Sequence, residues 1–193
     1  MKHLNTLFLI VAIVSLTSFT FKDPGYQIDS QKSKVTWVGK KVTGQHAGTI
    51  NLSEGNFTSK GKNITGGSFT IDMTSLKDEA ANARLEGHLK SDDFFSTEKF
   101  PKATFVASKI ESKGGDQYVV KGKLTIKGIT NEIEFPATIQ ISNDQVTAKA
   151  KILVDRTKFD IKFRSGNFFE NLGDKAIEDN FELNVELVGK ATI

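Results

Sequence analysis

Four stretches in the later part of the chain alternate apolar and polar residues with a period of two. They are YVVKGKLTIKG (118–128), EIEFPATIQIS (132–142), VTAKAKILV (146–154) and FELNVELVGKATI (181–193). Such alternation is typical of β-strands that bury one face. Short segments rich in Gly, Asn or Asp separate the first three stretches, so the pattern predicts an antiparallel meander.

Shorter strand candidates precede these: KVTWVGKKV (34–42), TINLSEGNF (49–57), GSFTIDM (67–73) and ATFVASKIE (103–111). One segment breaks the alternation, because Ala81, Leu85 and Leu89 recur every fourth residue and predict a helix over 78–90, capped at Thr74 or Ser75. The expected fold is all-β, with about eight antiparallel strands in a barrel or sandwich and one α-helix packed against them.

The apolar faces of these strands are expected to point inward. A transmembrane barrel would carry aromatic residues at both strand ends, which the sequence lacks, and many Lys and Glu side chains would have to fit inside its narrow lumen. The inward positions include small residues, at Gly122, Ala137, Ala148, Ala150 and Ala191. Small residues leave volume, which favours a cavity lined by phenylalanines; the alternative is a filled core in which they face aromatic partners.

The amino-terminal residues predict export. Lys2 and His3 precede a ten-residue apolar run, LFLIVAIVSL (7–16), which indicates a signal peptide over residues 1–21 and a single domain over 22–193. The run is too short to cross a bilayer, and the mature chain is expected to have no transmembrane segment. The chain has no cysteine, which excludes a lipid-modified cysteine, so the expected location is periplasmic or secreted.

Charge and titratable residues give little support for other functions. The net charge of +3 is spread over interspersed acids and bases, so no nucleic-acid partner is expected. His46 and His88 with Asp92 or Asp93 form a weak ligand set, and no metal or other cofactor is expected. A hydrolase using His88 remains an alternative, although no strained nucleophile turn accompanies it.

Three segments resemble the YceI-like family of exported lipid-binding proteins. They are GHLKSDDFFSTEKFPKATF (87–105), GKLTIKGITNEIEFPATI (122–139) and DRTKFDIKF (155–163), and GQHAG (44–48) is similar to an early element of that family. The resemblance spans the chain from Tyr26 onward and implies an extended lipocalin-like antiparallel barrel. It further implies that the interior binds a polyisoprenoid or other long-chain amphiphile. The segment FRSGNFFENLGDKAIEDNF (163–181) is longer than the family pattern.

These observations predict an exported, non-enzymatic carrier or sequestering protein, with a ligand-free interaction module as a further alternative. The oligomeric state is left open, a dimer included. The expected wall of the ligand cavity consists of Trp37, Phe69, Phe94, Phe105, Leu124, Ile126, Phe135, Ala148 and Ala150. The expected mouth, with a flap over it and contacts for a polar head group, consists of His46, Arg84, His88, Asp93, Phe95, Phe100 and Arg164.

Overall fold

The computed structural model describes residues 25–61 and 63–192, and the expected signal peptide over 1–21 lies outside them. Strands dominate the described part of the chain. The strands are β1 (Gly25–Ile28), β2 (Lys34–Lys41), β3 (Gly44–Lys60), β4 (Asn63–Asp78), β5 (Lys102–Gly114), β6 (Gln117–Ile126), β7 (Ile129–Ser142), β8 (Gln145–Asp155) and β9 (Ile177–Thr192). The helices are α1 (Ala83–Lys90) and two short 3₁₀ turns, η1 (Arg156–Phe159) and η2 (Gly173–Lys175).

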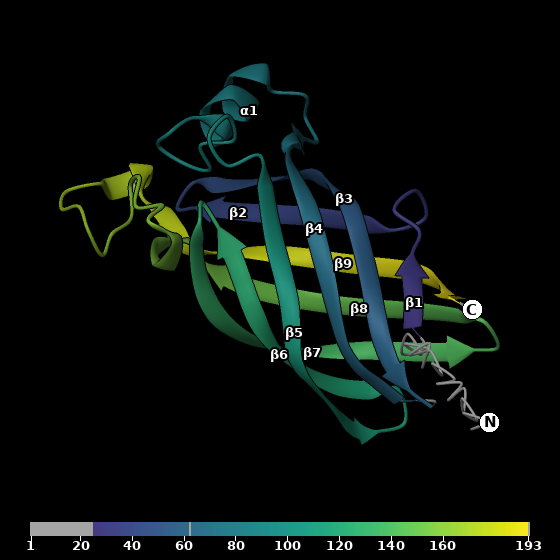
Figure 1. Cartoon of the computed structure of the whole chain (residues 1–193). Coiled ribbons are helices and arrows are strands. Elements are labelled where there is room, and N and C mark those ends of the chain that lie inside the picture. Colours follow the sequence, from purple (N-terminus) through teal and green to yellow (C-terminus); the bar gives the residue numbers. More distant parts are fainter. Residues whose placement is uncertain (1–24, 62, 193) are drawn as a thin grey trace, which may run out of the picture.

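The strands form one antiparallel sheet that closes on itself. Eight strands follow each other in the order β2-β9-β8-β7-β6-β5-β4-β3. Strand β3 also pairs with β2, which completes a ring of eight. Figure 1 shows the resulting barrel, with α1 at one end. The predicted all-β antiparallel barrel of about eight strands with one helix is therefore confirmed.

Strand β1 occupies the same position in the ring as β2, between β3 and β9, because both strands pair antiparallel with these two neighbours. A turn at residues 29–33 separates the two strands. The Asp29 N–H donates to the carbonyl of Val188 at 2.8 Å, and the Ser33 hydroxyl donates to the Asp29 carbonyl at 2.8 Å. Polar groups of the turn are thus hydrogen-bonded, and strands β1 and β2 continue the barrel wall on either side of it.

The helix begins later than the sequence pattern predicts, and this part of the prediction is wrong. Strand β4 runs to Asp78, where it still pairs with Gly48 of β3, so neither Thr74 nor Ser75 is a helix cap. Ala81 has a left-handed backbone with φ of 54°, which a helix cannot contain. The cap is Asn82, whose side-chain oxygen accepts from the Leu85 N–H at 3.1 Å.

This cap makes a direct prediction for stability. Asn82→Ala removes the acceptor for an otherwise orphaned N–H and is expected to lower the free energy of unfolding by about 1 kcal/mol. Gly87→Ala is the matched control, because a Cβ there meets nothing within 4 Å, and helix propensity predicts a gain of up to about 1 kcal/mol. Urea unfolding of both variants measures the two changes, and equal signs would contradict the assignment of the cap.

The small inward residues do not all create volume. A Cβ built at Gly122 would lie 2.5 Å from Cζ of Phe105, so this glycine makes room for the Phe105 ring and does not line a cavity. Ala191 is exposed at the end of β9. The expectation of added volume is wrong at these two positions, and Ala137, Ala148 and Ala150 lie on the cavity wall.

No helix within residues 25–61 and 63–192 has the length and apolar character needed to cross a membrane.

Candidate functional site

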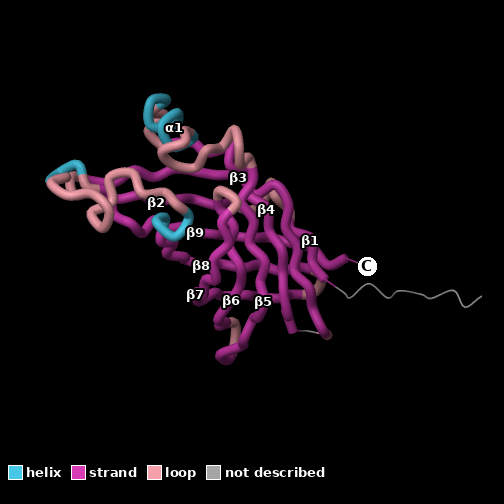
Figure 2. Tube along the Cα trace, turned by 60° about the vertical axis from the view of Figure 1, so that its left-hand side comes forward, coloured by secondary structure: helices cyan, strands magenta, loops and turns pink. Residues whose placement is uncertain are grey.

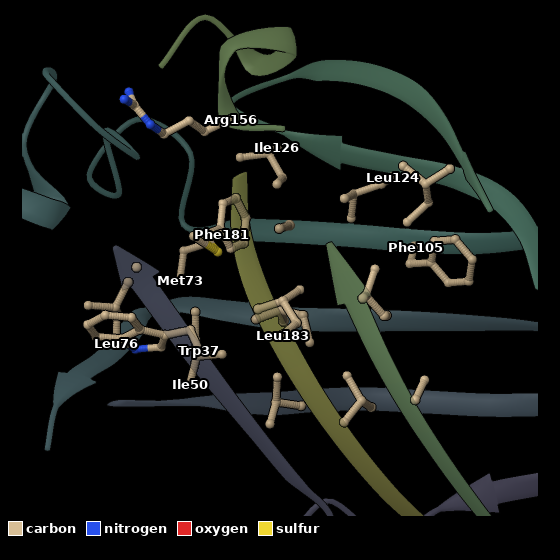
Figure 3. A pocket seen from close by; sticks show the side chains of 18 of the residues that line it. Trp37, Ile50, Met73, Leu76, Phe105, Leu124, Ile126, Arg156, Phe181 and Leu183 are labelled. Atoms are coloured by element: carbon tan, nitrogen blue, oxygen red, sulfur yellow. The ribbon is translucent and has the colours of Figure 1, made fainter. Parts of the chain in front are cut away.

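The barrel encloses a cavity of ≈ 380 Å³. This volume falls in the range of about 300–1,000 Å³ that is usual for small-molecule sites. Apolar side chains from every strand between β2 and β9 form most of its wall, including Ile50, Met73 and Leu183 (Figure 3). The interior of this barrel is therefore not filled, in contrast to the filled-core alternative.

All nine residues expected in the cavity wall lie there. They are Trp37, Phe69, Phe94, Phe105, Leu124, Ile126, Phe135, Ala148 and Ala150. Period-two alternation explains the placement, because Leu124 and Ile126 share the inward face of β6, and Ala148 and Ala150 share that of β8. Their placement is a finding, and their role in binding a ligand remains a prediction.

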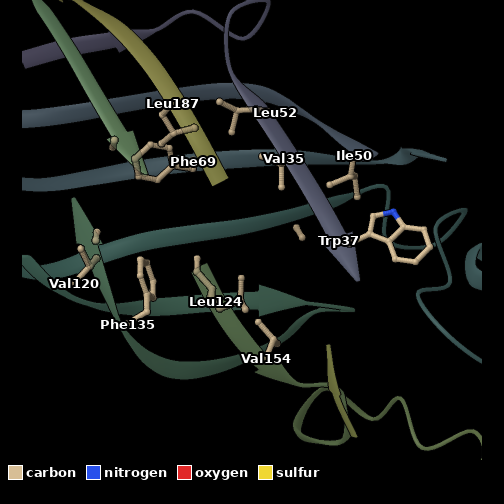
Figure 4. Close-up of a cluster of buried hydrophobic side chains, with 14 of the residues drawn as sticks. Val35, Trp37, Ile50, Leu52, Phe69, Val120, Leu124, Phe135, Val154 and Leu187 are labelled. Carbon is tan, nitrogen blue, oxygen red and sulfur yellow. The ribbon is translucent and has the colours of Figure 1, made fainter. Parts of the chain in front are cut away.

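Aromatic rings form a large part of the wall. Figure 4 shows Phe69 and Phe135 pointing into the interior from different strands and Trp37 farther along it. The Phe105 ring lies 5.5 Å from that of Phe135 and 6.4 Å from that of Phe69, measured between centroids. The Trp37 indole N–H donates to the Lys77 carbonyl at 3.2 Å, so its only polar atom is satisfied and its ring presents an apolar surface.

Helix α1 and the segment 91–100 cover one end of the barrel, which we call the mouth end. His88, Phe94 and Phe163 meet there, with ring centroids between 4.7 and 5.5 Å apart. The Phe95 ring lies 6.2 Å from that of Phe181 on β9. These contacts join α1 to the long connection between β8 and β9, which Figure 2 also shows at this end.

The segment after α1 is held by the last carbonyls of the helix. The Phe95 N–H donates to the Leu89 carbonyl at 3.1 Å, and the Thr97 N–H donates to the Lys90 carbonyl at 3.0 Å. The Ser91 hydroxyl donates to the carbonyl of His88 at 2.8 Å. Carbonyls that a helix end leaves without partners thus position the phenylalanines of the segment.

Polar residues of the cavity wall gather at the mouth end. Lys40, Lys41 and Arg164 belong to the wall and are also solvent-exposed, so the cavity reaches solvent here. His46 also lies in the wall, with its Nδ1 atom 3.8 Å from Oδ1 of Asp78. The cavity therefore has an apolar interior and a polar, mainly cationic opening.

The other residues expected at the mouth lie differently. His88 and Phe95 belong to the wall, whereas Arg84, Asp93 and Phe100 do not. Arg84 and Asp93 are exposed, and Asp93 Oδ2 lies 3.3 Å from His88 Nε2. Phe100 packs against the turn at Gly128, where a Cβ would lie 3.2 Å from its ring.

Arg156 is a residue of the mouth end that the sequence reasoning missed. It is 4 % exposed, and its guanidinium donates to the carbonyls of Glu178 at 3.0 Å, Ile161 at 2.8 Å and Ile177 at 3.0 Å. Burial lowers the pKa of Arg156, and the carboxylate of Asp179, 3.4 Å away, opposes that shift. In Figure 3 the guanidinium points away from the apolar side chains of the cavity.

The alternation in β8 contained the signal for this residue. Inward positions recur at Val146, Ala148, Ala150, Ile152 and Val154, and one further step reaches position 156. An arginine on an inward face requires several acceptors. The connection between β8 and β9 supplies them, and Arg156 therefore fastens this connection to the barrel.

The surroundings of the histidines offer little for catalysis. The contacts of the His88 ring within the described chain are with Asp93, Phe94 and Phe163, and no hydroxyl is among them. A nucleophile would have to lie within hydrogen-bond reach of the base. Among residues 25–61 and 63–192, no three His, Asp or Glu side chains come together as a metal site.

His88 instead holds the cover of the mouth end together, and this has a measurable consequence. His88→Ala removes two edge-to-face ring contacts worth about 0.5–1.5 kcal/mol each. We expect amide exchange at Phe95 and Thr97 to become about tenfold faster, since their N–H groups lie in the segment that these contacts hold. Arg84→Ala, on the exposed side of α1, is the control and should leave exchange unchanged. Equal exchange in both variants would contradict this role.

Known proteins of similar sequence include members of the UPF0312 group. A UPF0312 protein of Photorhabdus laumondii is 27 % identical over 139 residues, covering 72 % of this chain and 71 % of its own. A UPF0312 protein of Shewanella sp. (strain ANA-3) is 32 % identical over 90 residues. That match covers 47 % of either chain, so the matched part spans about half the length of this relative.

Two solved structures share the fold. The crystal structure of Burkholderia cenocepacia BcnA superposes with a TM-score of 0.70 and 26 % identity, over 83 % of this chain and 98 % of that one. A polyisoprenoid-binding domain from Saccharophagus degradans superposes with a TM-score of 0.66, over 86 % of this chain and 98 % of that one. Its identity of 15 % supports similarity of fold alone.

The sequence match to a family covers nearly the whole described barrel. The YceI-like domain matches residues 26–189, from β1 into β9, and so includes every strand that lines the cavity. The three segments that carried the resemblance all lie within this range. The chain belongs to the family of proteins with a YceI-like domain.

Proposed function

We propose that the protein is an exported, non-enzymatic binding protein that holds a polyisoprenoid or another long-chain amphiphile in the barrel and carries or sequesters it. The observation that carries the proposal is the cavity of ≈ 380 Å³, with an apolar wall and polar groups concentrated at the mouth end. An amphiphile fits this division, with its chain inside and its head group at the opening.

The depth of the barrel supports a long chain. Strands β3, β4 and β9 have 17, 16 and 16 residues, respectively. At about 3.3 Å per residue, each could extend over about 50 Å. Strands of this length can offer contacts along an extended hydrocarbon chain.

Family membership and the fold of a polyisoprenoid-binding domain support binding over catalysis. Export, to a periplasm or out of the cell, is supported by the apolar run at residues 7–16. Binding of a hydrocarbon chain needs no cofactor, and none is proposed.

Mass spectrometry of an organic extract tests this function. The protein is purified without detergent after expression from its complete gene, extracted, and compared with a cavity-filled variant purified in the same way. We expect a long-chain amphiphile in near-stoichiometric amount from the unsubstituted protein and a strongly reduced amount from the variant. Equal traces of ordinary lipid in both extracts would overturn the proposal.

A further inference from the structure

Large exposed apolar side chains gather at the mouth end of the barrel. Over the described residues these side chains are Val42, Val106, Ile129, Leu153, Phe168 and Phe169. Val42 lies in the β2–β3 turn, Ile129 follows the β6–β7 turn, and Leu153 lies two residues before the end of β8. The two phenylalanines lie between η1 and η2, and Val106 lies on the outer wall, four residues into β5 from its start at the mouth end.

The opposite end of the barrel differs. The turns there are formed by Gly61 and its neighbours, by Gly115 and Asp116, and by Asn143 and Asp144. In the described parts of these turns no large apolar side chain is exposed. Single exposed apolar residues scattered over a surface are usual and need no explanation. Exposed apolar residues that gather at one end of a molecule instead indicate an interaction site.

The two phenylalanines are held outward by an ordered turn. The N–H groups of Phe168 and Phe169 donate to the carbonyl of Ser165 at 3.1 and 3.0 Å, and Ser165 is fully buried. The Asn167 amide donates to Asp179 at 2.6 Å. Both rings nevertheless remain 50 % exposed, so this ordered turn holds them in contact with solvent.

These rings belong to a connection that forms part of the cavity wall. Phe163 and Arg164, in the same connection, belong to the cavity wall. The N–H of Val42 donates to the Ala176 carbonyl at 3.4 Å, which ties the β2–β3 turn to this connection. Val42, Phe168 and Phe169 therefore flank the opening, and we call these three residues the rim.

The charges around the rim suit the polar layer of a lipid bilayer. Lys40, Lys41 and Arg164 are exposed beside it, and the Lys162 ammonium lies 5.1 Å from the centroid of the Phe168 ring. Acidic groups are also present, at Asp160, Glu170, Asp174 and Glu178, and the Asp160 carboxylate pairs with Lys162 at 2.8 Å. The four acids equal the four cations in number, so the region as a whole carries no excess of positive charge. In the cavity wall itself, however, Lys40, Lys41 and Arg164 outnumber Glu178, and there they can contact phosphate-bearing head groups while the rings enter the apolar layer.

We propose that the rim is a membrane-docking surface that presents the cavity opening to a lipid bilayer. Rings at the level of the head groups and cations against the phosphates are the combination by which peripheral proteins bind membranes. This orientation places the opening where an amphiphile can pass between bilayer and barrel without crossing water. Membrane docking is a separate property from ligand binding in the barrel. Vesicle binding is measured without added ligand, so either proposal can fail while the other holds.

Cosedimentation with vesicles tests the docking. The complete chain is mixed with vesicles of phosphatidylcholine alone and of phosphatidylcholine with phosphatidylglycerol. Phe168→Ser combined with Phe169→Ser is expected to weaken partition into both by at least about tenfold, because two half-exposed rings lose their burial. Val106→Ser is the control, since Val106 is 49 % exposed but lies away from the rim, and it should bind as the unsubstituted chain does.

A site-specific readout separates this surface from any other membrane contact. Phe168→Trp is prepared in a Trp37→Phe background, so that the new indole is the only one. Bromine-labelled lipid tails are expected to quench its emission strongly, and to leave the emission of Trp37 in the unsubstituted chain nearly unchanged. Absence of quenching at position 168 overturns the proposal. Loss of a dimer in the double serine variant, without a change in vesicle binding, would show that the rim is an interface between copies and overturn it as well.

Discussion

Arg156→Ala is expected to lower the free energy of unfolding by about 3–5 kcal/mol, the usual result of removing one partner from a buried charged network. The substitution leaves the carbonyls of Ile161, Ile177 and Glu178 without their donor in a region that water does not reach freely. It also leaves the partly buried carboxylate of Asp179 without its cationic partner. A typical domain is stable by about 5–15 kcal/mol, so this loss is large.

The connection between β8 and β9 supplies its own control. Arg164→Ala removes a cation of the same type eight residues further on, whose recorded contact is with the Phe163 ring at 5.1 Å. That side chain is exposed, and the change should stay within about 0.5 kcal/mol. Guanidinium-chloride unfolding of both variants measures the difference, and a loss below about 1 kcal/mol for Arg156→Ala would show that Arg156 does not fasten this connection.

Filling the cavity is expected to have the second large effect, on binding. Ala148 lies on the wall and is 7 % exposed, with Ala150 two residues further along the same face of β8. Ala148→Trp places an indole in space that the ligand would occupy. Because the strain of overpacking, about 1–3 kcal/mol, then falls on the complex, the Kd is expected to rise about 5- to 150-fold.

The same substitution reports on the cavity itself. With ≈ 380 Å³ of space the barrel can take up an indole, and the free energy of unfolding should change by less than about 1 kcal/mol. Lys151→Trp is the control, since it places the same ring on the outer face of β8, where it removes the ion pair between the exposed Lys151 ammonium and the Glu182 carboxylate and leaves the cavity unchanged. Binding is followed through the fluorescence of cis-parinaric acid. An unchanged Kd in a folded Ala148→Trp variant would contradict a ligand site in the barrel.

The strands could be predicted because their alternation is almost unbroken. Within β6, β7 and β8 each step of two returns to the interior, and five of the nine expected wall residues follow from that register: Leu124, Ile126, Phe135, Ala148 and Ala150. A one-residue slip would expose the whole apolar set, so a pattern of this kind fixes the facing of every side chain. The start of α1 was less predictable, because Thr74 and Ser75 are residue types that cap helices, although here they belong to β4, which continues to Asp78.

Interactions across the barrel could not be predicted from local pattern. Gly122 occupies an inward position of β6, and only the spatial neighbour Phe105 explains why a glycine is needed there. Arg156 required knowledge of the fold in a similar way, because its acceptors include Ile161 and also Ile177 at the start of β9, which lies 21 residues after Arg156. In both cases the deciding contact joins elements that the sequence alone does not bring together.

The residues expected at the mouth end also differ in a way that the local pattern does not predict. His46 and Arg164 reach the wall from the β2–β3 hairpin and from the β8–β9 connection, whereas Asp93 and Arg84 point to solvent. Their spacing along the chain carries no information on this difference. It depends on how α1 and the segment 91–100 lie over the barrel. The ring contacts of His88 in α1, and of Phe94 and Phe95 in that segment, with Phe163 and Phe181 determine this position.

Trp37 provides the most direct test of the central claim that the barrel interior binds a long apolar chain. It is the only tryptophan in the sequence, it lies in the cavity wall, and it is 8 % exposed. Titration with cis-parinaric acid, a polyene that accepts energy from indole over short distances, is predicted to quench Trp37 emission saturably at one chain per protein. Emission that stays constant, or that falls linearly without saturation, would contradict a binding site in the interior.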